Sequence, residues 1–435
     1  MKSLILGGAL ALAAVLAAPA GATTIETVTS PGGITAWLVE DHANPVIAMS
    51  VAISGGAALD PAGKAGLGNM VTDLLDEGAG DLDSQAYQGK LNDLSIGLDF
   101  GIERDAMTIG LKTLADNRDV AFNLLGLALA KPRFDADAIE RVRGQELAGL
   151  DEELGNPRSI AGRAMAALLF PNHPYGLPAN GDPGTVKAIT RDDLLAWVAH
   201  HIGRDALIVS VAGDVTPDQL KPLLDSAFAG LPAHADPVAV PEIAAQSAGK
   251  VQVIRKPFAQ SVAVLAEDGI KRDDPDWYAA FVMNYILGGG GLNSRLMTEV
   301  REKRGLAYQT ESFLVPHDHA ALIEATVATR NDRMAESLAV IREQWQRMAG
   351  VGVTGTELAA AKKYLNGSFP LEFSSTGSLA GLLNIVQRNR LGIDYLDRRH
   401  VLIDKVSADD VRRVAKRLLK PDALATVVVG DPKGM

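Results

Sequence analysis

Hydrophobic and polar positions follow two periods along this chain, which together predict short strands separated by amphipathic helices. Strand-like runs are found at residues 34–39, 45–54, 106–113, 207–211, 251–254, 261–266, 306–314, 321–329 and 424–429. Helical periods are found at residues 66–77, 115–130, 334–348 and 356–365. Strand pairs next to helix pairs predict an α+β fold, in which helices cover a mostly antiparallel sheet.

The same order of residues occurs twice, at positions 217 apart (Asp192 and Asp409). The matches are Asp192-Asp193-Leu194 with Asp409-Asp410-Val411, Asp205-Ala206-Leu207 with Asp422-Ala423-Leu424, and Gly213-Asp214 with Gly430-Asp431. Three matches in one register indicate a duplication. We therefore predict two homologous halves, residues 23–230 and 250–435, joined by a proline-containing linker at residues 231–249.

The first 22 residues are predicted to be a cleaved signal peptide. One lysine precedes an apolar run that ends at Ala20-Gly21-Ala22, the pattern of an A-x-A cleavage site. No later segment is apolar enough to predict a membrane span. The chain has no cysteine, so no disulfide stabilises it, and a bacterial periplasm is the predicted location.

The formal net charge is -11, and the chain has no basic block that would attract phosphates. Both features argue against nucleic-acid binding. Removal of the predicted signal peptide takes away only Lys2 and makes the balance more negative. We expect no nucleic-acid partner.

A glycine-rich turn lies at the centre of the second half. Asp274-Pro275 is predicted to begin the helix before it, with Asp274 as N-cap. The buried stripe of that helix is predicted to be Tyr278, Phe281, Val282, Tyr285 and Ile286. The turn itself, which is predicted to leave room for another backbone, consists of Gly288, Gly289, Gly290 and Gly291.

A second short helix is predicted to follow the turn. Asn293 or Ser294 caps it, and Gly305 ends it before an extended run. The positions predicted to point inward are Leu296, Met297 and Val300. Arg301 in the last turn of the helix and Tyr308 on the strand are expected to converge beside the glycine-lined gap. Without further context, Arg301 would be interpreted as a solvated residue at a helix end.

This arrangement resembles the Arg/Tyr pair of the pitrilysin-type zinc peptidases, which carry the inverted motif HxxEH and include mitochondrial processing peptidase and insulin-degrading enzyme. The resemblance spans nearly the whole mature chain. It implies a processing-peptidase-like metallohydrolase fold, in which the two halves form a clam shell around an extended peptide. It also implies that Arg301 and Tyr308 act across the substrate from a zinc ion.

The zinc motif itself is degenerate in this chain. Residues 66–73 occupy its place, but Asn69 and Asp73 stand in the two histidine slots and Thr72 in the slot of the glutamate base. An amide is a weak zinc ligand and a threonine is no base near neutral pH. The third ligand slot is expected between Glu146 and Glu153, without a choice among them. We therefore predict that this chain holds no catalytic zinc.

Other histidines are weaker candidates for a metal site. His317 and His319 flank Asp318 in a loop that is predicted to lie at the surface. His200 and His201 are adjacent on a helix, so their side chains diverge. Residues 170–176, FPNHPYG, match a loop that the resemblance treats as structural.

The resemblance implies that this chain is the non-catalytic subunit of a heterodimeric zinc peptidase. A homologous partner would carry HxxEH and the zinc, and this chain would bind the peptide substrate and would not be active alone. Arg301 and Tyr308 are the predicted catalytic residues, and Gly288, Gly289, Gly290 and Gly291 are the predicted substrate-binding residues. The alternatives are a structural scaffold protein of the same fold and a stand-alone peptidase with an unseen zinc site.

Overall fold

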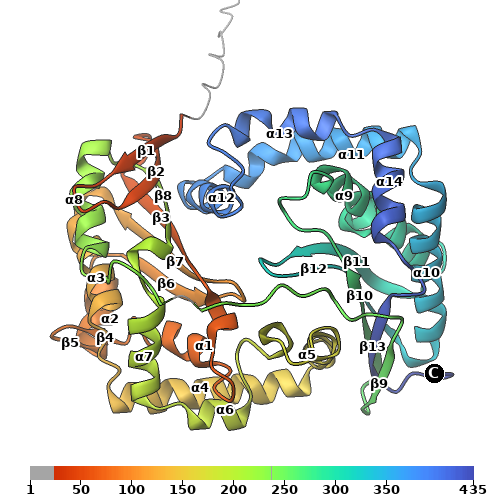
Figure 1. The fold of residues 1–435 in the computed structure, drawn as a ribbon, viewed down its shortest axis with the longest axis horizontal. Helices are drawn as coiled ribbons and strands as arrows, with labels where there is room; N and C mark the ends of the chain where they lie inside the picture. Colours follow the sequence, from red (N-terminus) through yellow and green to blue (C-terminus); the bar gives the residue numbers. More distant parts are fainter. Residues whose placement is uncertain (1–23, 237) are drawn as a thin grey trace, which may run out of the picture.

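The computed structural model describes residues 24–236 and 238–435; the predicted signal peptide lies outside this part of the chain. Each half of the sequence contributes one sheet, and the two sheets lie on opposite sides of the molecule (Figure 1). The arrangement confirms the predicted α+β clam shell of two halves. Among the described residues, no helix has the length and apolar character needed to span a bilayer.

The first sheet has six strands in the order β1-β2-β8-β3-β7-β6. The strands are β1 (Glu26–Thr29), β2 (Thr35–Glu40), β3 (Val46–Ser54), β6 (Gly97–Ile102), β7 (Ala106–Leu114) and β8 (Leu207–Gly213). Only β2 and β8 pair in parallel. A separate two-stranded sheet consists of β4 (Gly78–Ala79) and β5 (Leu82–Asp83).

The second sheet has five strands in the order β11-β12-β10-β13-β9. The strands are β9 (Val251–Arg255), β10 (Gln260–Asp268), β11 (Ala307–Pro316), β12 (Ala321–Arg330) and β13 (Ala425–Gly430). Only β9 and β13 pair in parallel. Both sheets are thus mostly antiparallel, as the sequence predicts.

Helices follow the strands in both halves. In the first half they are α1 (Leu67–Thr72), α2 (Ser84–Asp93), α3 (Arg118–Ala130), α4 (Ala136–Gly155), α5 (Pro157–Leu169), α6 (Pro183–Ala188), α7 (Arg191–His201) and α8 (Pro217–Phe228). In the second half they are α9 (Trp277–Asn284), α10 (Met334–Val351), α11 (Gly355–Ser368), α12 (Thr376–Arg388), α13 (Tyr395–Asp404) and α14 (Ala408–Leu418).

The duplicated segments adopt the same local structure. Helix α7 begins with a capping box in which Thr190 and Asp193 exchange hydrogen bonds, and α14 begins with the equivalent box of Ser407 and Asp410. Each helix is followed by a buried strand, β8 or β13. The repeat in the sequence therefore corresponds to a repeat in the structure.

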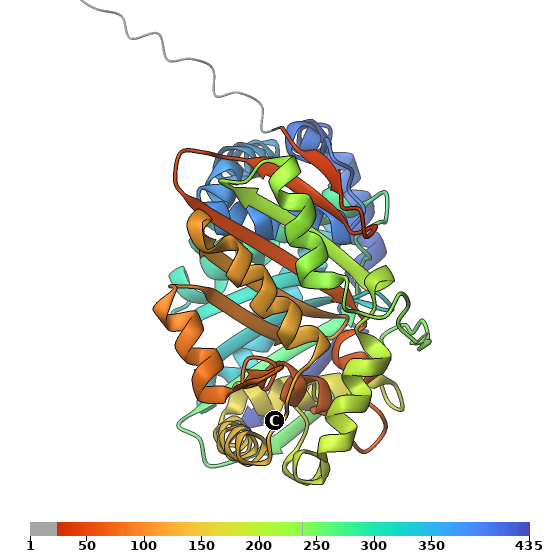
Figure 2. The same cartoon turned by 90° about the vertical axis from the view of Figure 1, so that its left-hand side faces the viewer.

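Each sheet buries its outer face under helices of its own half. Figure 2, in which the first half faces the viewer, shows α3 and α8 lying across the first sheet, and the two helices share one apolar core with its strands. In the second half, α9, α10 and α14 enclose the corresponding core around Trp345. These outer layers hold each half together.

Each sheet also receives a helix from the other half on its inner face. Helix α5 packs Met165 and Leu169 against Val264 and Val427 of the second sheet. Helix α12 packs on β3 and β8 of the first sheet, where the Asn384 amide donates to the carbonyl of Ile208 at 2.8 Å. This exchange fixes the two halves relative to each other.

Two helix predictions are wrong in detail. Helix α9 begins at Trp277, two residues after the predicted start. The Asp274 carboxylate accepts from the Asp276 amide at 2.8 Å and also pairs with Arg417 at 2.5 Å. Helix α1 ends at Thr72, well before the predicted end at residue 77. The predicted stripe of α9 is buried only at Val282 and Ile286; its members Tyr278, Phe281 and Tyr285 are half-buried.

Candidate functional site

The structure brings Arg301 and Tyr308 into contact. The guanidinium carbon of Arg301 lies 4.4 Å from the centre of the Tyr308 ring, a cation–π arrangement. Tyr308 is 79% exposed, an unusual state for a large aromatic side chain. The prediction that these two side chains converge is therefore met by the geometry, while their catalytic role stays a prediction.

The helix that carries Arg301 is a π-helix, η7 (Met297–Glu302), and a second π-helix, η5 (Tyr285–Gly289), extends α9. Ser294 begins the turn before η7, since its hydroxyl accepts from the amide of Met297 at 3.3 Å. The predicted inward positions Leu296, Met297 and Val300 are all buried. Single π-helical turns occur often at functional sites.

The connection from η7 to β11 is short and tightly bonded. The Gly305 amide donates to the Arg301 carbonyl at 2.9 Å, and Gly305 has the left-handed φ of +57° that ends a helix. The Leu306 amide then donates to the Val300 carbonyl, also at 2.9 Å. Arg301 and Tyr308 are thus held on one continuous backbone turn.

Tyr308 lies in an irregularity of the sheet. Ala307 is opposite Thr329, but Thr310 is opposite Val327, so Tyr308 and Gln309 together face a single residue of β12. Such a β-bulge redirects the side chain that it contains and is common beside active sites. The bulge explains why Tyr308 projects from an otherwise well-packed edge strand.

The four glycines are required for two different reasons. A Cβ atom on Gly288 would lie 2.5 Å from the Ser312 amide nitrogen, one on Gly289 2.9 Å from the Asn284 amide, and one on Gly290 2.7 Å from the Tyr285 carbonyl. Gly291 instead has open space around it and a φ of +57°. The first three glycines therefore let the turn pack against its own protein; their contact with substrate stays a prediction.

The turn is fixed to β11 by a buried pair of side chains. The Asn284 amide donates to the Ser312 carbonyl at 3.1 Å, and the Ser312 hydroxyl donates to the Asn284 side-chain oxygen at 2.7 Å. Both residues are buried. The glycine turn therefore covers the edge of β11 at Ser312.

The degenerate motif of the first half has a different character. The Asn69 amide donates to a carboxyl oxygen of Glu146 and lies 3.4 Å from a carboxylate oxygen of Asp73. Thr72 is buried, and its hydroxyl donates to the Asn69 carbonyl at 2.8 Å. These polar groups are bonded mostly to one another.

Glu146 is the residue of α4 that meets Asn69. Glu153 lies two turns further along the same face, where it accepts instead from Arg163 at 2.7 Å and Asn180 at 2.6 Å. Helical periodicity alone does not distinguish the two glutamates, which is why the sequence left the slot open. Among the candidates from Glu146 to Glu153, the structure places Glu146 beside the motif.

The surroundings of Glu146 favour its neutral form. Burial, together with the hydrogen bond and the charge of the neighbouring Asp73 carboxyl, raises the pKa of Glu146 to about 8. A carboxyl next to another carboxyl is harder to ionise, so this site favours the neutral form of Glu146.

Comparison with known proteins agrees with this picture. Residues 188–365 match the family described as the peptidase M16 inactive domain. A structure described as the peptidase M16 inactive domain from Pseudomonas fluorescens superposes with a TM-score of 0.88 at 27% identity and covers 94% of this chain and 98% of that chain. Residues 188–365 thus match a domain of the M16 peptidase family, and nearly the whole chain shares the fold of the Pseudomonas structure.

Two relatives of this chain carry contrasting names. The non-peptidase homolog YmxG of Helicobacter pylori is 28% identical over 344 residues, 78% of each chain. An uncharacterized zinc protease of Streptomyces coelicolor is 31% identical over 264 residues. That match covers 59% of this chain and only 57% of the Streptomyces protein. The match of residues 188–365 to an inactive domain agrees with the degenerate motif of this chain.

The residues at the motif do not fit the zinc that active M16 peptidases hold. Catalytic zinc takes three nitrogen, sulfur or carboxylate ligands together with a water. This site offers a neutral amide and two carboxyl groups, of which Glu146 has a raised pKa, and it has no imidazole. Within the described part of the chain, no group of three or more acidic, histidine or cysteine side chains is arranged to hold a metal.

The remaining histidines have structural surroundings. The loop that carries His317 is only partly at the surface: Asp318 is exposed, whereas the His317 side chain is 20% exposed and its ring lies 4.9 Å from Tyr175. That contact joins the loop at residues 170–176 to the second half. His200 pairs with Asp236 at 2.5 Å, whereas His201 meets Trp197 edge-on, so the two side chains diverge as predicted.

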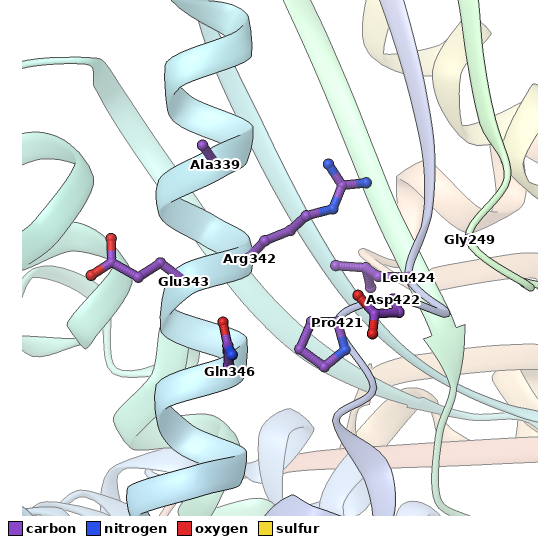
Figure 3. A pocket seen from close by; sticks show the side chains of 8 residues that line it. All are labelled: Gly249, Ala339, Arg342, Glu343, Gln346, Pro421, Asp422 and Leu424. Carbon is purple, nitrogen blue, oxygen red and sulfur yellow. The ribbon is translucent and has the colours of Figure 1, made fainter.

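A hollow of about 430 Å³ lies between α10 and the loop before β13 (Figure 3). Arg342 reaches from α10 to the Thr426 hydroxyl at 2.8 Å, and burial lowers the pKa of its guanidinium. Glu343 and Asp422 also line the hollow, and their carboxylates disfavour an anionic ligand. None of the residues of the Arg301–Tyr308 pair or of the degenerate motif lines this hollow.

Proposed function

We propose that this protein is the non-catalytic subunit of a heterodimeric zinc peptidase of the periplasm. It binds an extended peptide and presents Arg301 and Tyr308 opposite a zinc ion that a homologous, HxxEH-bearing partner holds. One observation carries the proposal: an exposed, preassembled Arg301–Tyr308 pair occurs in a chain whose own motif does not fit zinc.

The two side chains have complementary tasks in peptide hydrolysis. The Tyr308 phenol donates a hydrogen bond to the oxyanion of the tetrahedral intermediate, where charge develops. The Arg301 guanidinium is stacked through its face on the ring, which leaves its edge N–H groups free to grip a substrate carbonyl or carboxylate. The metal and the base come from the partner.

An extended substrate needs an unpaired sheet edge. Strand β11 is an edge strand, but the glycine turn covers it at Ser312. Strand β6 ends the first sheet beside α1, and among the described residues no strand pairs with its outer side. The exposed inner positions of β6 include Gly97 and Asp99. We assign the added substrate strand to this edge.

Tyr308 also argues against a purely structural scaffold protein. A side chain that is 79% exposed contributes little to a core, and Arg301 forms no ion pair among the described residues. A scaffold needs neither residue. The scaffold alternative nevertheless makes a distinct experimental prediction, because it allows complex formation without any effect of Tyr308 on cleavage.

The experiment co-expresses this chain with each HxxEH-bearing homologue from its own genome. We expect a complex with one copy of each chain, with an interface on the order of 2,000 Å² or more. The complex should cleave a reporter peptide, whereas neither chain alone should do so at a comparable rate. A chain that stays monomeric with every such homologue, or a partner that is fully active alone, would contradict the proposal.

A further inference from the structure

The bulge that presents Tyr308 is bridged by two buried hydroxyl groups. The Thr310 hydroxyl donates to the Thr326 carbonyl at 2.9 Å, and the Thr329 hydroxyl donates to the Leu306 carbonyl. Thr310 and Thr329 are 1% and 2% exposed. One bond lies on each side of the register shift, so the two side chains connect β11 and β12 where the backbone ladder is interrupted.

Leu306 links the two side chains of the proposed site. Its amide donates to Val300 in η7, next to Arg301, and its carbonyl accepts from Thr329. Both backbone groups of Leu306 are therefore fixed, one to the helix of Arg301 and one to the sheet. Movement at Leu306 would change the distance and angle between the guanidinium and the phenol ring.

A valine at either position would have nearly the same shape but no hydroxyl. Valine would fit the buried strand, yet it would leave a carbonyl without its partner. A threonine at these two positions is thus explained by the bulge and not by burial alone. The sequence pattern gives no hint of this, because threonine and valine both suit a strand.

We infer that Thr310 and Thr329 are positioning residues, which hold the Tyr308–Gln309 bulge in the one conformation that places the phenol under Arg301. The geometric part of this inference concerns the isolated chain, and its effect on cleavage rests on the proposed function. Neither threonine touches the substrate, so both act only through Tyr308.

The first measurement uses the full isolated chain and does not depend on activity. Amide hydrogen exchange at Tyr308 and Gln309 is compared among the wild type, Thr310→Val and Thr329→Val. We expect exchange to become about 5–10-fold faster, which corresponds to the loss of one net hydrogen bond. Thr329→Ser, which keeps the hydroxyl, should restore the wild-type rate.

The matched control is Thr113→Val in β7 of the other sheet. Thr113 is also a buried strand residue, and its hydroxyl also donates to a backbone carbonyl, that of Leu114 at 3.2 Å. This control removes the same kind of bond far from Tyr308. Exchange at Tyr308 and Gln309 that is equally fast or equally slow in all three valine variants would overturn the inference.

The second measurement uses the active heterodimer, with Tyr308→Phe tested in parallel. We expect kcat to fall about 10-fold in Thr329→Val and Thr310→Val with KM little changed, because a displacement below 1 Å already slows catalysis. Thr113→Val should keep the wild-type kcat. If Tyr308→Phe slows cleavage but the threonine variants do not, the positioning inference fails. If Tyr308→Phe itself has no effect, the proposed function fails, and hydrogen exchange alone decides the inference.

Discussion

The two halves share equivalent segments, as their capping boxes show, yet they treat their polar residues in opposite ways. In the first half, Asn69 donates to Glu146 and lies beside Asp73, and the pKa of the Glu146 carboxyl is raised. In the second half, Tyr308 is exposed, and the Arg301 guanidinium lies over its ring.

This difference separates the degenerate zinc motif, whose polar groups bond to one another, from the exposed Arg301–Tyr308 pair. Polar side chains that satisfy each other have little left to offer a ligand, since their donors and acceptors are already used. An exposed phenol and an unpaired guanidinium keep their hydrogen-bonding capacity. We therefore locate the remaining function of this chain in its second half.

The largest expected effect comes from Tyr308→Phe in the heterodimer. The substitution removes one hydrogen-bond donor and leaves the ring and its stacking on Arg301 in place. Loss of one oxyanion donor lowers kcat by about 10²–10³, with KM little altered. Steady-state cleavage of a reporter peptide measures this effect.

A matched control is Tyr364→Phe. Tyr364 is another exposed tyrosine of the second half and stacks on Tyr285 at 5.3 Å. It should leave kcat unchanged, because it lies outside the Arg301–Tyr308 pair. If the Tyr308→Phe heterodimer cleaves the peptide at the wild-type rate, Tyr308 supplies no oxyanion donor, and the proposed role of the second half is wrong.

Arg301→Ala should have the next largest effect. The guanidinium grips the substrate before and during the reaction, so KM should rise and kcat should fall. The combined loss in kcat/KM is expected to be about 10–100-fold, the range of one hydrogen bond to a charged group. Arg301→Lys should recover only part of this loss, since an ammonium lacks the planar fork. A change in KM alone would limit Arg301 to binding.

Restoring the motif tests the other side of the comparison. The wild-type chain, purified alone, should contain far less than one zinc by elemental analysis and should have no peptidase activity. Asn69→His, Thr72→Glu and Asp73→His together should raise the zinc content toward one, because they supply two imidazoles and a base. We expect little cleavage, since partners around the ligands are also needed. Near-stoichiometric zinc in the wild type would contradict our view of this site.

Most strands and helices could be predicted from the sequence. Strands and amphipathic helices are local patterns, so β3, β7, β10 and β12 appear within a few residues of their predicted ranges. The predicted start of α9 is two residues early, although the Asp274 carboxylate accepts from the Asp276 amide at 2.8 Å. The ion pair of Asp274 with Arg417 is a long-range contact, which local signals do not report.

The site was predictable in part for the same reason. Arg301 and Tyr308 are close in sequence, and Gly305 fixes the turn between them, so their convergence follows from short-range rules. The contact of Asn69 with Glu146 spans two distant helices and needed the structure. The bulge at Tyr308 also has no sequence signal, because a register shift depends on the pairing of β11 with β12.

The smallest expected effect concerns the pH dependence of stability at the degenerate zinc motif. The folded pKa of Glu146, about 8, lies above its ordinary value of 4.5, mainly because burial disfavours the charged carboxylate. A raised folded pKa gives stability that is present in full below 4.5 and is lost as the pH rises through about 8. Glu146→Gln keeps a neutral group in this position at every pH. Its melting temperature should therefore fall less than that of the wild type between pH 6 and pH 9.

The control for this last effect is Glu152→Gln, an exposed glutamate on the same helix α4. It removes one negative charge from the same region without touching Asn69 or Asp73, so the wild-type slope of melting temperature against pH should remain. Equal slopes for the wild type and Glu146→Gln would show that Glu146 is already ionised in the folded chain. Asp73 and Glu146 would then form a doubly charged pair, and the first half would keep an anionic site for a cation instead of a closed network.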